Sequence, residues 1–250
     1  MPKPEVLERG SIYFIYRPKV EEEEVKGLKE VQRFYMVLSP EGKKIYRLIV
    51  VGRQALPDVE GGERSWGFVD KVRRRAEEVA DELEEKEYRT KTRGERELPA
   101  ARPAGEGVYA IARHGDHTHL AYSLELPERP GEVQEAFRIE DEASYIVTIK
   151  NPEKPAPPGA GLKGRKKAGF PKRLMQKFDG RRFADADPPD FLDYEGAEMI
   201  LIGASEEPIK ELGLALKPKD ETESSADIFK DLKLEREKHP VKPLLKGKWE

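Results

Sequence analysis

Three of the four histidines in this chain lie within the run His114-Gly115-Asp116-His117-Thr118-His119. Imidazole nitrogens bind zinc, iron and nickel, and a site with three protein ligands keeps one position for a water molecule that can attack a substrate. Asp116 or Glu125 would complete or orient such a set. The same run also fits a polar surface for a ligand or partner and an ordinary solvated strand, so the sequence leaves three hypotheses open.

The flanking residues predict that a tight β-hairpin carries these histidines. Residues 108–113 and 120–126 alternate in character, and Gly115-Asp116 is a two-residue connector of the kind that closes hairpins. This register pairs His114 with His117 and Ala112 with His119, which places all three imidazoles on one face. Small side chains that leave room above the sheet line that face, and large apolar side chains form the opposite, buried face. The first group is Ala110, Ala112 and Ala121, and the second is Tyr109, Ile111, Leu120, Tyr122, Leu124 and Leu126.

A second group of residues is basic and predicts contacts with a phosphate backbone. Only Asp179 opposes the positive charges between residues 163 and 182, and Phe170, Phe178 and Phe183 are interleaved with them. Basic side chains neutralise phosphates and aromatic rings stack on bases, so the segment is a candidate nucleic-acid-binding site, although a linker that is merely soluble has the same composition. The basic residues are Lys163, Arg165, Lys166, Lys167, Lys172, Arg173, Lys177, Arg181 and Arg182.

A third group is acidic and directly follows the basic one. Paired carboxylates hold hard cations such as magnesium or act as an acid and a base. Their spacing matches no known metal-binding loop, and we expect them to cap turns and to pair with the preceding arginines. The group consists of Asp185, Asp187, Asp190, Asp193, Glu195 and Glu198.

The composition excludes several classes of protein. The chain has 250 residues, no cysteine and a formal net charge of −3. Disulfides, thiolate catalysis and thiolate metal sites are excluded, and any transition metal would need histidine, carboxylate and water as ligands. No apolar run approaches the roughly 20 residues of a membrane helix, and the residues after Met1 do not resemble a signal peptide. We therefore expect a cytoplasmic protein without a membrane partner.

The composition also predicts high thermal stability. Charged residues make up 38% of the chain, and Asn151 is its only asparagine. Abundant Glu, Lys and Arg with few thermolabile residues are typical of thermophiles. We expect calorimetry to give a melting temperature above the mesophile range of about 45–65 °C, and a midpoint within that range would contradict the expectation.

The hydrophobic pattern predicts an α+β protein that consists mainly of antiparallel strands, with an SH3-like barrel in its N-terminal part. Apolar residues at helical spacing over residues 68–88 predict one long amphipathic helix. Residues 89–107 show little periodicity and are expected to form a long surface loop. Strands are expected over residues 10–16, 31–38, 45–51, 143–150 and 198–202, and a short helix over residues 171–178.

The predicted organisation is one main body with appendages. A β-rich body over residues 1–150 is followed by a connector rich in Pro, Gly and Lys over 151–170, a helix-loop-strand segment over 171–204 that returns to the body, and a charged C-terminal arm over 205–250. We expect the arm to dock on the body or on a partner. Its apolar residues are Ile228, Phe229 and Leu232 on one helical face, and Val241, Leu244, Leu245 and Trp249 in a groove.

Two stretches near the N-terminus resemble the opening of the PemK-like growth-inhibitor toxins, which are SH3-like barrels that cleave RNA. They are Arg9-Gly10-Ser11-Ile12-Tyr13-Phe14 and Arg33-Phe34-Tyr35-Met36-Val37-Leu38-Ser39. In that family an arginine before the second strand and a threonine after the third carry catalysis. Arg33 occupies the place of the arginine, whereas the third strand ends Val50-Val51-Gly52-Arg53 without a threonine.

Over most of its length the chain also resembles a bacterial family of uncharacterised proteins, and this resemblance implies no activity. The phrases that carry it are Glu8-Arg9-Gly10-Ser11-Ile12-Tyr13, His117-Thr118-His119-Leu120-Ala121-Tyr122 and Asp190-Phe191-Leu192-Asp193-Tyr194-Glu195-Gly196.

The function expected from the sequence is that of a non-catalytic binding protein. It would engage RNA or a protein partner through the basic connector and the C-terminal arm, without an organic cofactor. The alternative is a metal-dependent hydrolase in which His114, His117, His119 and Asp116 hold zinc, iron or nickel. Whether the protein is an enzyme, and its oligomeric state, are left open by the sequence.

Overall fold

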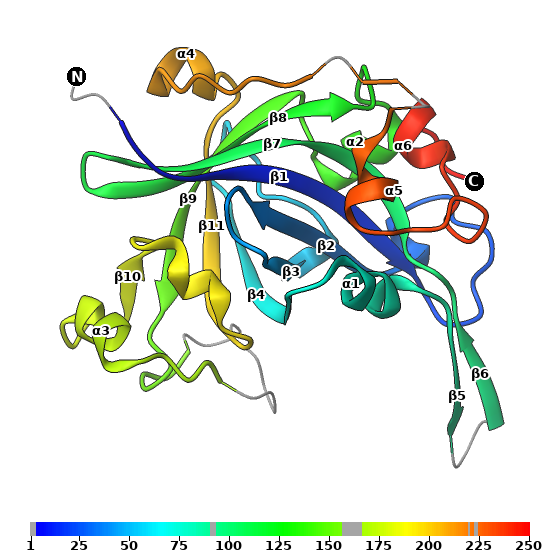
Figure 1. Ribbon diagram of the computed structural model, residues 1–250, viewed down its shortest axis with the longest axis horizontal. Coiled ribbons are helices and arrows are strands. Elements are labelled where there is room, and N and C mark those ends of the chain that lie inside the picture. The colour runs from blue at the N-terminus through cyan, green and yellow to red at the C-terminus, as the bar shows by residue number, and fades with distance from the viewer. Residues whose placement is uncertain (1–3, 91–93, 157–166, 220, 223–224) are drawn as a thin grey trace.

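A closed barrel of eight antiparallel strands forms the centre of the protein in a computed structural model that describes residues 4–90, 94–156, 167–219, 221–222 and 225–250 (Figure 1). Around the barrel the order is β9-β11-β4-β3-β2-β1-β7-β8, and pairing of β8 with β9 closes it. The barrel strands are β1 (Glu5–Pro18), β2 (Val31–Pro40), β3 (Tyr46–Val51), β4 (Arg64–Arg73), β7 (Arg102–His114), β8 (His117–Leu126), β9 (Glu142–Lys150) and β11 (Glu198–Ser205).

The other described elements are short and lie outside the barrel. The edge strand β10 (Phe183–Asp185) pairs with β9, while β5 (Lys86–Thr90) and β6 (Gly94–Leu98) form a separate two-stranded ribbon that projects from the body (Figure 1). The helices are α1 (Ala76–Leu83), α2 (Glu132–Phe137), α3 (Lys172–Met175), α4 (Pro208–Leu212), α5 (Asp227–Asp231) and α6 (Lys242–Lys246), and the 3-10 turns are η1 (Leu28–Glu30), η2 (Gly52–Gln54), η3 (Gln176–Phe178) and η4 (Pro189–Asp193). None of the described helices is long and apolar enough to cross a membrane.

The long amphipathic helix predicted over residues 68–88 is wrong, and a β-bulge explains the misleading pattern. The segment is divided among β4, the eight-residue helix α1 and β5. In β4, Lys71 lies opposite Leu48 and Val69 lies opposite Ile49, so Asp70 is an extra residue. The bulge lets Val69 and Val72 both pack on the interior cluster although three positions separate them. An apolar spacing of three residues therefore imitated a helix inside a strand.

The predicted fold class needs two further corrections. The protein is mostly antiparallel β with short helices, and its barrel is not confined to the N-terminal part, because β7, β8, β9 and β11 complete it. Residues 89–107, expected to be a loop, contain most of the β5–β6 ribbon and the start of β7. The expectation of a barrel of antiparallel strands was roughly right.

Aromatic rings fill the barrel interior. Alternation along β1 sends Ile12, Phe14 and Tyr16 into the interior cluster and Tyr13 and Ile15 to the outer surface. Inside, the rings of Phe34 and Phe137 stack with centroids 4.6 Å apart. Burial of this many large side chains supplies the main driving force for closing the barrel.

The C-terminal arm packs on the barrel of its own chain. Ile228, Phe229, Leu232 and Leu244 are buried against the outward side chains of β1 to β3, in a cluster that also includes α1. The indole of Trp249 lies edge-on to Tyr16 inside the barrel, with ring centroids 5.7 Å apart. These apolar residues of the arm thus pack against the barrel of the same chain.

A buried glutamate anchors part of the arm. Glu106 on β7 is 1% exposed and accepts hydrogen bonds from the backbone N–H groups of Ile228 at 2.8 Å and Asp227 at 3.2 Å. Burial, together with a hydrogen bond with Glu221, raises the pKa of Glu106 to about 9. The Glu106 carboxyl group is therefore protonated at pH 7.

A buried ion pair lies where β1 and β3 meet the turn η4. Arg47 is fully buried and donates to Glu8 at 2.5 and 2.9 Å and to Asp193 at 2.7 Å. The hydroxyl of Tyr109 donates to the same Glu8 carboxylate at 2.9 Å. Burial alone would raise the pKa of Glu8, but the hydrogen bonds and charge of Arg47 outweigh this and hold the pKa below its usual range.

Candidate functional site

The predicted histidine hairpin is confirmed in its register. His114 lies opposite His117 and Ala112 lies opposite His119 across the β7–β8 pair. Gly115 has a φ of 60°, a conformation that glycine adopts without strain, and this allows the tight turn. Alternation along the two strands places the three histidines and the small alanines on one face, as expected.

The space expected above the alanines is filled. Leu212, Leu214 and Leu216 of the C-terminal arm pack against Ala110, Ala112 and Ala121 in one buried cluster. Small side chains on this face therefore accommodate a covering segment of the same chain rather than a ligand.

The three imidazoles differ sharply in environment. His117 is exposed, His114 is half-buried, and His119 is only 8% exposed. Burial, together with the neighbouring His114 and His117, lowers the pKa of His119 to about 4. His119 is therefore neutral at pH 7, and the rings of His114 and His119 lie with their centroids 6.2 Å apart.

The described residues do not form the predicted metal site. Among them, no group of three or more histidine, aspartate or glutamate side chains is arranged to hold a metal ion. Asp116 is exposed at the turn, and Glu125 accepts a hydrogen bond from the backbone N–H of Lys219 at 2.6 Å. Zinc, iron or nickel ligation by His114, His117, His119 and Asp116 thus gains no support from the geometry.

A pocket beside the hairpin brings together residues from all three groups singled out in the sequence. This hairpin pocket has a volume of about 550 Å³ and is open to solvent. His117 and Asp116 line it from the hairpin, Lys177 and Arg181 from the basic group, and Asp185 and Asp187 from the acidic group; Arg113, Gly115, Thr118 and Ala184 complete it. Segments about sixty positions apart in the sequence therefore share one polar concavity.

The basic group lies on the surface next to this pocket. Within the part of the chain that the structure describes, Lys172, Lys177, Arg181 and Arg182 are exposed and form no ion pair with a carboxylate. Lys167 is also exposed and donates to the carbonyl of Pro152, whereas Arg173 pairs with Asp190 at 2.9 Å. Lys163, Arg165 and Lys166 lie outside the described residues. We call the exposed residues Lys167, Lys172, Lys177, Arg181 and Arg182 the basic surface.

The phenylalanines that were candidates for stacking on bases are used in packing. Phe178 is fully buried, and its ring contacts Phe170 and Phe191 at centroid distances of 6.0 and 5.4 Å. Phe183 is half-buried against Trp66, 6.2 Å between centroids. These rings hold α3 and η3 on the barrel, so the basic surface presents charge without an exposed phenylalanine.

Most of the acidic group forms ion pairs, but within the described part of the chain only Asp190 pairs with an arginine of the preceding basic group, Arg173. Asp187 accepts from Arg113 at 2.7 Å, Asp193 from Arg47, and Glu195 from Arg73 at 2.8 Å. Asp185 differs, because its carboxylate has no hydrogen-bond or ion-pair partner among the described residues and lines the hairpin pocket. Asp185 is therefore available to accept a hydrogen bond from a ligand.

A second pocket was missed by the sequence reasoning. It is lined by residues of β1 to β4, α1 and the β5–β6 ribbon and has a volume of about 390 Å³. Arg33, which the resemblance to PemK-like toxins marks as a catalytic arginine, lines it and lies 3.6 Å from Asp70. The signal in the sequence that could have indicated the ribbon was the alternation of charged side chains over residues 86–98. This signal was overlooked because these residues were assigned to the end of a helix and to a loop.

No protein-family model, curated protein or solved structure matches this chain. The resemblances drawn from short sequence phrases stay predictions, and the function has to be argued from the geometry of the two pockets and the basic surface.

Proposed function

We propose that this protein binds single-stranded RNA through the basic surface and the adjoining hairpin pocket. The observation that carries the proposal is the set of exposed cations, Lys172, Lys177, Arg181 and Arg182, that no carboxylate of the described chain neutralises. Lysines and arginines without a carboxylate partner attract phosphate groups, and their binding is favourable because it releases the counterions condensed on the nucleic acid.

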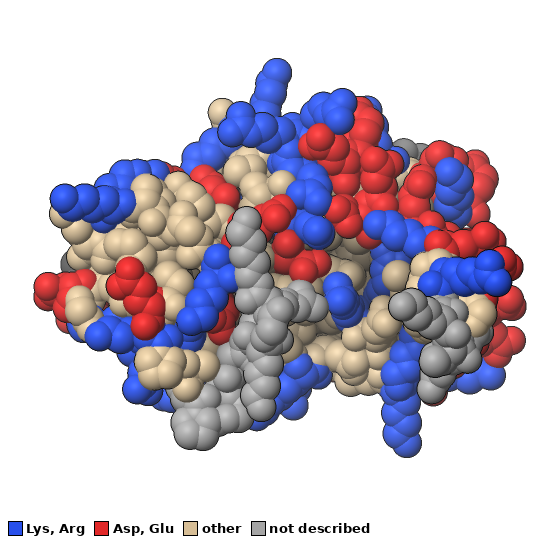
Figure 2. Space-filling view, turned by 90° about the horizontal axis from the view of Figure 1, so that it is seen from below, with Lys and Arg blue, Asp and Glu red and all other residues tan. Residues whose placement is uncertain are grey.

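The distribution of charge favours a local binding surface. The whole chain has a formal net charge of −3, and Figure 2 shows Lys and Arg interspersed with Asp and Glu over the face seen from below. A broad positive field is absent from that face. The basic surface would therefore engage a few successive phosphates rather than a long polynucleotide track.

The hairpin pocket supplies groups that favour RNA over DNA. Lys177 and Arg181 line it beside the carboxylate of Asp185. A carboxylate without a partner can accept a hydrogen bond from a ribose 2′-hydroxyl, which DNA lacks. Because the phenylalanines are packed into the protein, we expect little dependence of affinity on base sequence.

The test is the salt dependence of RNA binding. We expect a fluorescent ten-nucleotide RNA to bind at low salt. The logarithm of its association constant should fall linearly with the logarithm of the salt concentration. The triple variant Lys172→Gln, Lys177→Gln, Arg182→Gln removes three phosphate contacts, so the slope should become shallower by about 2. Anisotropy titrations at several salt concentrations measure both quantities.

A matched control removes the same charge elsewhere. Lys26, Lys210 and Lys238 are exposed lysines that each pair with a glutamate, and their triple replacement by Gln should leave the slope unchanged. The proposal is wrong if the wild-type protein does not retain RNA at low salt, or if both triple variants change the slope equally. An Asp185→Asn variant that binds RNA and the matching DNA equally well would support the role of the 2′-hydroxyl.

A further inference from the structure

The second pocket, here called the ribbon pocket, is lined by two chemically distinct sets of side chains. The cationic set is Arg17, Arg33, Lys71 and Lys86, and the apolar and aromatic set is Val20, Tyr35, Leu48, Tyr88 and Leu98. Gln32, Asp70 and Glu82 add hydrogen-bond acceptors. A concave site of this size with apolar side chains and a few convergent polar groups is typical of small-molecule binding.

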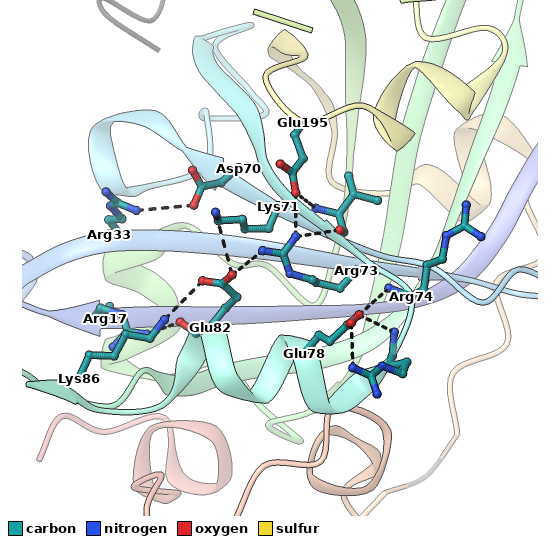
Figure 3. Close-up of polar contacts among 12 residues, drawn as sticks. Arg17, Arg33, Asp70, Lys71, Arg73, Arg74, Glu78, Glu82, Lys86 and Glu195 are labelled. Atoms are coloured by element: carbon teal, nitrogen blue, oxygen red, sulfur yellow. Dashed lines mark hydrogen bonds and ion pairs between the residues drawn. The ribbon is translucent and has the colours of Figure 1, made fainter. Parts of the chain in front are cut away.

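The cations of the ribbon pocket outnumber its carboxylates. Glu82 is the shared partner of Arg73 at 2.5 Å, Lys86 at 3.4 Å and Lys71 at 4.0 Å (Figure 3). One carboxylate thus forms ion pairs with three positive groups. Burial alone would raise the pKa of Glu82, but the three cations outweigh this effect and lower the pKa. The lining side chains carry an excess of two positive charges.

Arg17 contributes a fixed charge to this excess. It is 2% exposed, and its guanidinium donates to three backbone carbonyls, those of Glu82 at 2.7 Å, Glu84 at 3.1 Å and Pro99 at 2.5 Å. Backbone carbonyls satisfy its hydrogen bonds but do not neutralise its charge. The pocket therefore keeps a positive potential in a partly desolvated place, where it acts strongly on an anion.

The ribbon separates its side chains by charge. Along β5 and β6, Lys86, Tyr88, Arg96 and Leu98 share one face, because Lys86 lies opposite Leu98 and Tyr88 opposite Arg96. The other face carries Glu87, Glu95 and Glu97 together with Arg89. Tyr88 is 42% exposed and lines the pocket, so part of its ring is open to solvent there.

Acidic side chains are concentrated at the end of the molecule that carries the ribbon pocket. The carboxylates of Glu85, Glu23, Glu87 and Glu21 raise the pKa of Glu97, with Glu85 contributing most. Figure 2 shows Asp and Glu side chains gathered at the end that carries the ribbon. This acidic border would repel a long polyanion, whereas a small anion can enter the positive pocket within it.

We propose that the ribbon pocket binds a nucleoside monophosphate. Its phosphate, which carries close to two negative charges at pH 7, matches the excess of two positive charges, and its base matches the exposed ring of Tyr88. The carboxylate of Asp70 suits ribose hydroxyls. The inference is independent of RNA binding at the basic surface, since the two sites share no residue.

Isothermal titration of the full chain with adenosine monophosphate, uridine monophosphate, adenosine and inorganic phosphate tests the proposal. We expect both nucleotides to bind, and adenosine or inorganic phosphate alone to bind at least tenfold more weakly. Lys86→Gln and Tyr88→Ala should each weaken nucleotide binding by about tenfold, and Tyr88→Ala should leave phosphate binding unchanged. Arg89→Gln, on the opposite face of the same strand, is the matched control and should bind as the wild type does.

A variant with the opposite effect guards against loss of folding. Glu82→Gln removes the carboxylate that competes for Lys71 and Lys86, so it should tighten nucleotide binding by about threefold or more. Unfolding cannot produce a gain in affinity. The proposal is overturned if no nucleotide binds at millimolar concentration, if phosphate alone binds as tightly as the nucleotides, or if Arg89→Gln weakens binding as much as Lys86→Gln.

Discussion

Replacing Glu106 with glutamine is expected to stabilise the protein at pH 7. Glu106 has a pKa of about 9 in the folded protein, mainly because of burial, against 4.5 for an unperturbed glutamate. At pH 7 folding must therefore protonate a group that is ionised in the unfolded chain, at a cost of about 3 kcal/mol. Glutamine is neutral in both states, so Glu106→Gln removes this cost. Its single amide oxygen can accept the N–H of Ile228, while the N–H of Asp227 keeps Glu221 as its acceptor.

The gain should depend on pH in a defined direction. Because the folded pKa of Glu106 is raised, its contribution to stability is fully present below pH 4.5 and is lost as the pH rises through about 9. Wild type and Glu106→Gln should therefore unfold at similar denaturant concentrations at pH 4.5 and diverge progressively up to pH 9. Guanidinium unfolding curves at pH 4.5, 7 and 9 measure this, with the exposed Glu128→Gln as the control. Parallel pH dependence in wild type and Glu106→Gln would show that Glu106 is ionised in the folded protein.

Replacing Arg47 with methionine is expected to lower the free energy of unfolding by about 3–5 kcal/mol, because it leaves Glu8 buried without its counter-charge. Glu8 is 9% exposed and, among the described residues, would keep only Tyr109 and Lys43 as hydrogen-bond partners. The double variant Glu8→Gln, Arg47→Met removes both charges and should recover most of the loss. Urea unfolding of the two single variants and the double variant completes the cycle.

The surface pair Arg75–Glu78 provides the comparison. Arg75 is 70% exposed and lies 3.0 Å from Glu78, so Arg75→Met should cost less than about 1 kcal/mol. If Arg47→Met costs no more than this control, Glu8 does not depend on Arg47 in the folded protein, and water or Lys43 must compensate for its charge.

Local patterns in the sequence were sufficient to predict most of the barrel strands and one tight turn. The register of the histidine hairpin follows from a two-residue connector with a glycine and from strict alternation on both sides, and all of these signals lie within about twenty residues. The same logic failed at β4, where the extra residue Asp70 changes the period of the apolar pattern. A bulge is defined by its partner strand, and the partner could not be known from the sequence.

The candidate sites were predictable only as separate pieces. The basic and acidic groups were recognised from composition, but their meeting with the hairpin in one pocket depends on how β10 and η3 lie against the barrel. The cover of Leu212, Leu214 and Leu216 over the alanines likewise joins positions about a hundred residues apart. The ribbon pocket was missed because its walls come from β1, β2, β4, α1 and the ribbon, and no short stretch contains them together.

The strand order of the barrel sets how the chain must fold. Strands β1 to β4 pair in sequence order, but β1 must also pair with β7, and β11 must insert between β9 and β4, with Leu201 opposite both Ser65 and Val147. Such distant pairings have a high contact order, and chains dominated by them fold slowly, in milliseconds to seconds or longer. Until β11 is in place, β4 and β9 present unpaired edges to other chains. Aggregation during refolding should therefore compete with the last step of barrel closure and increase with protein concentration.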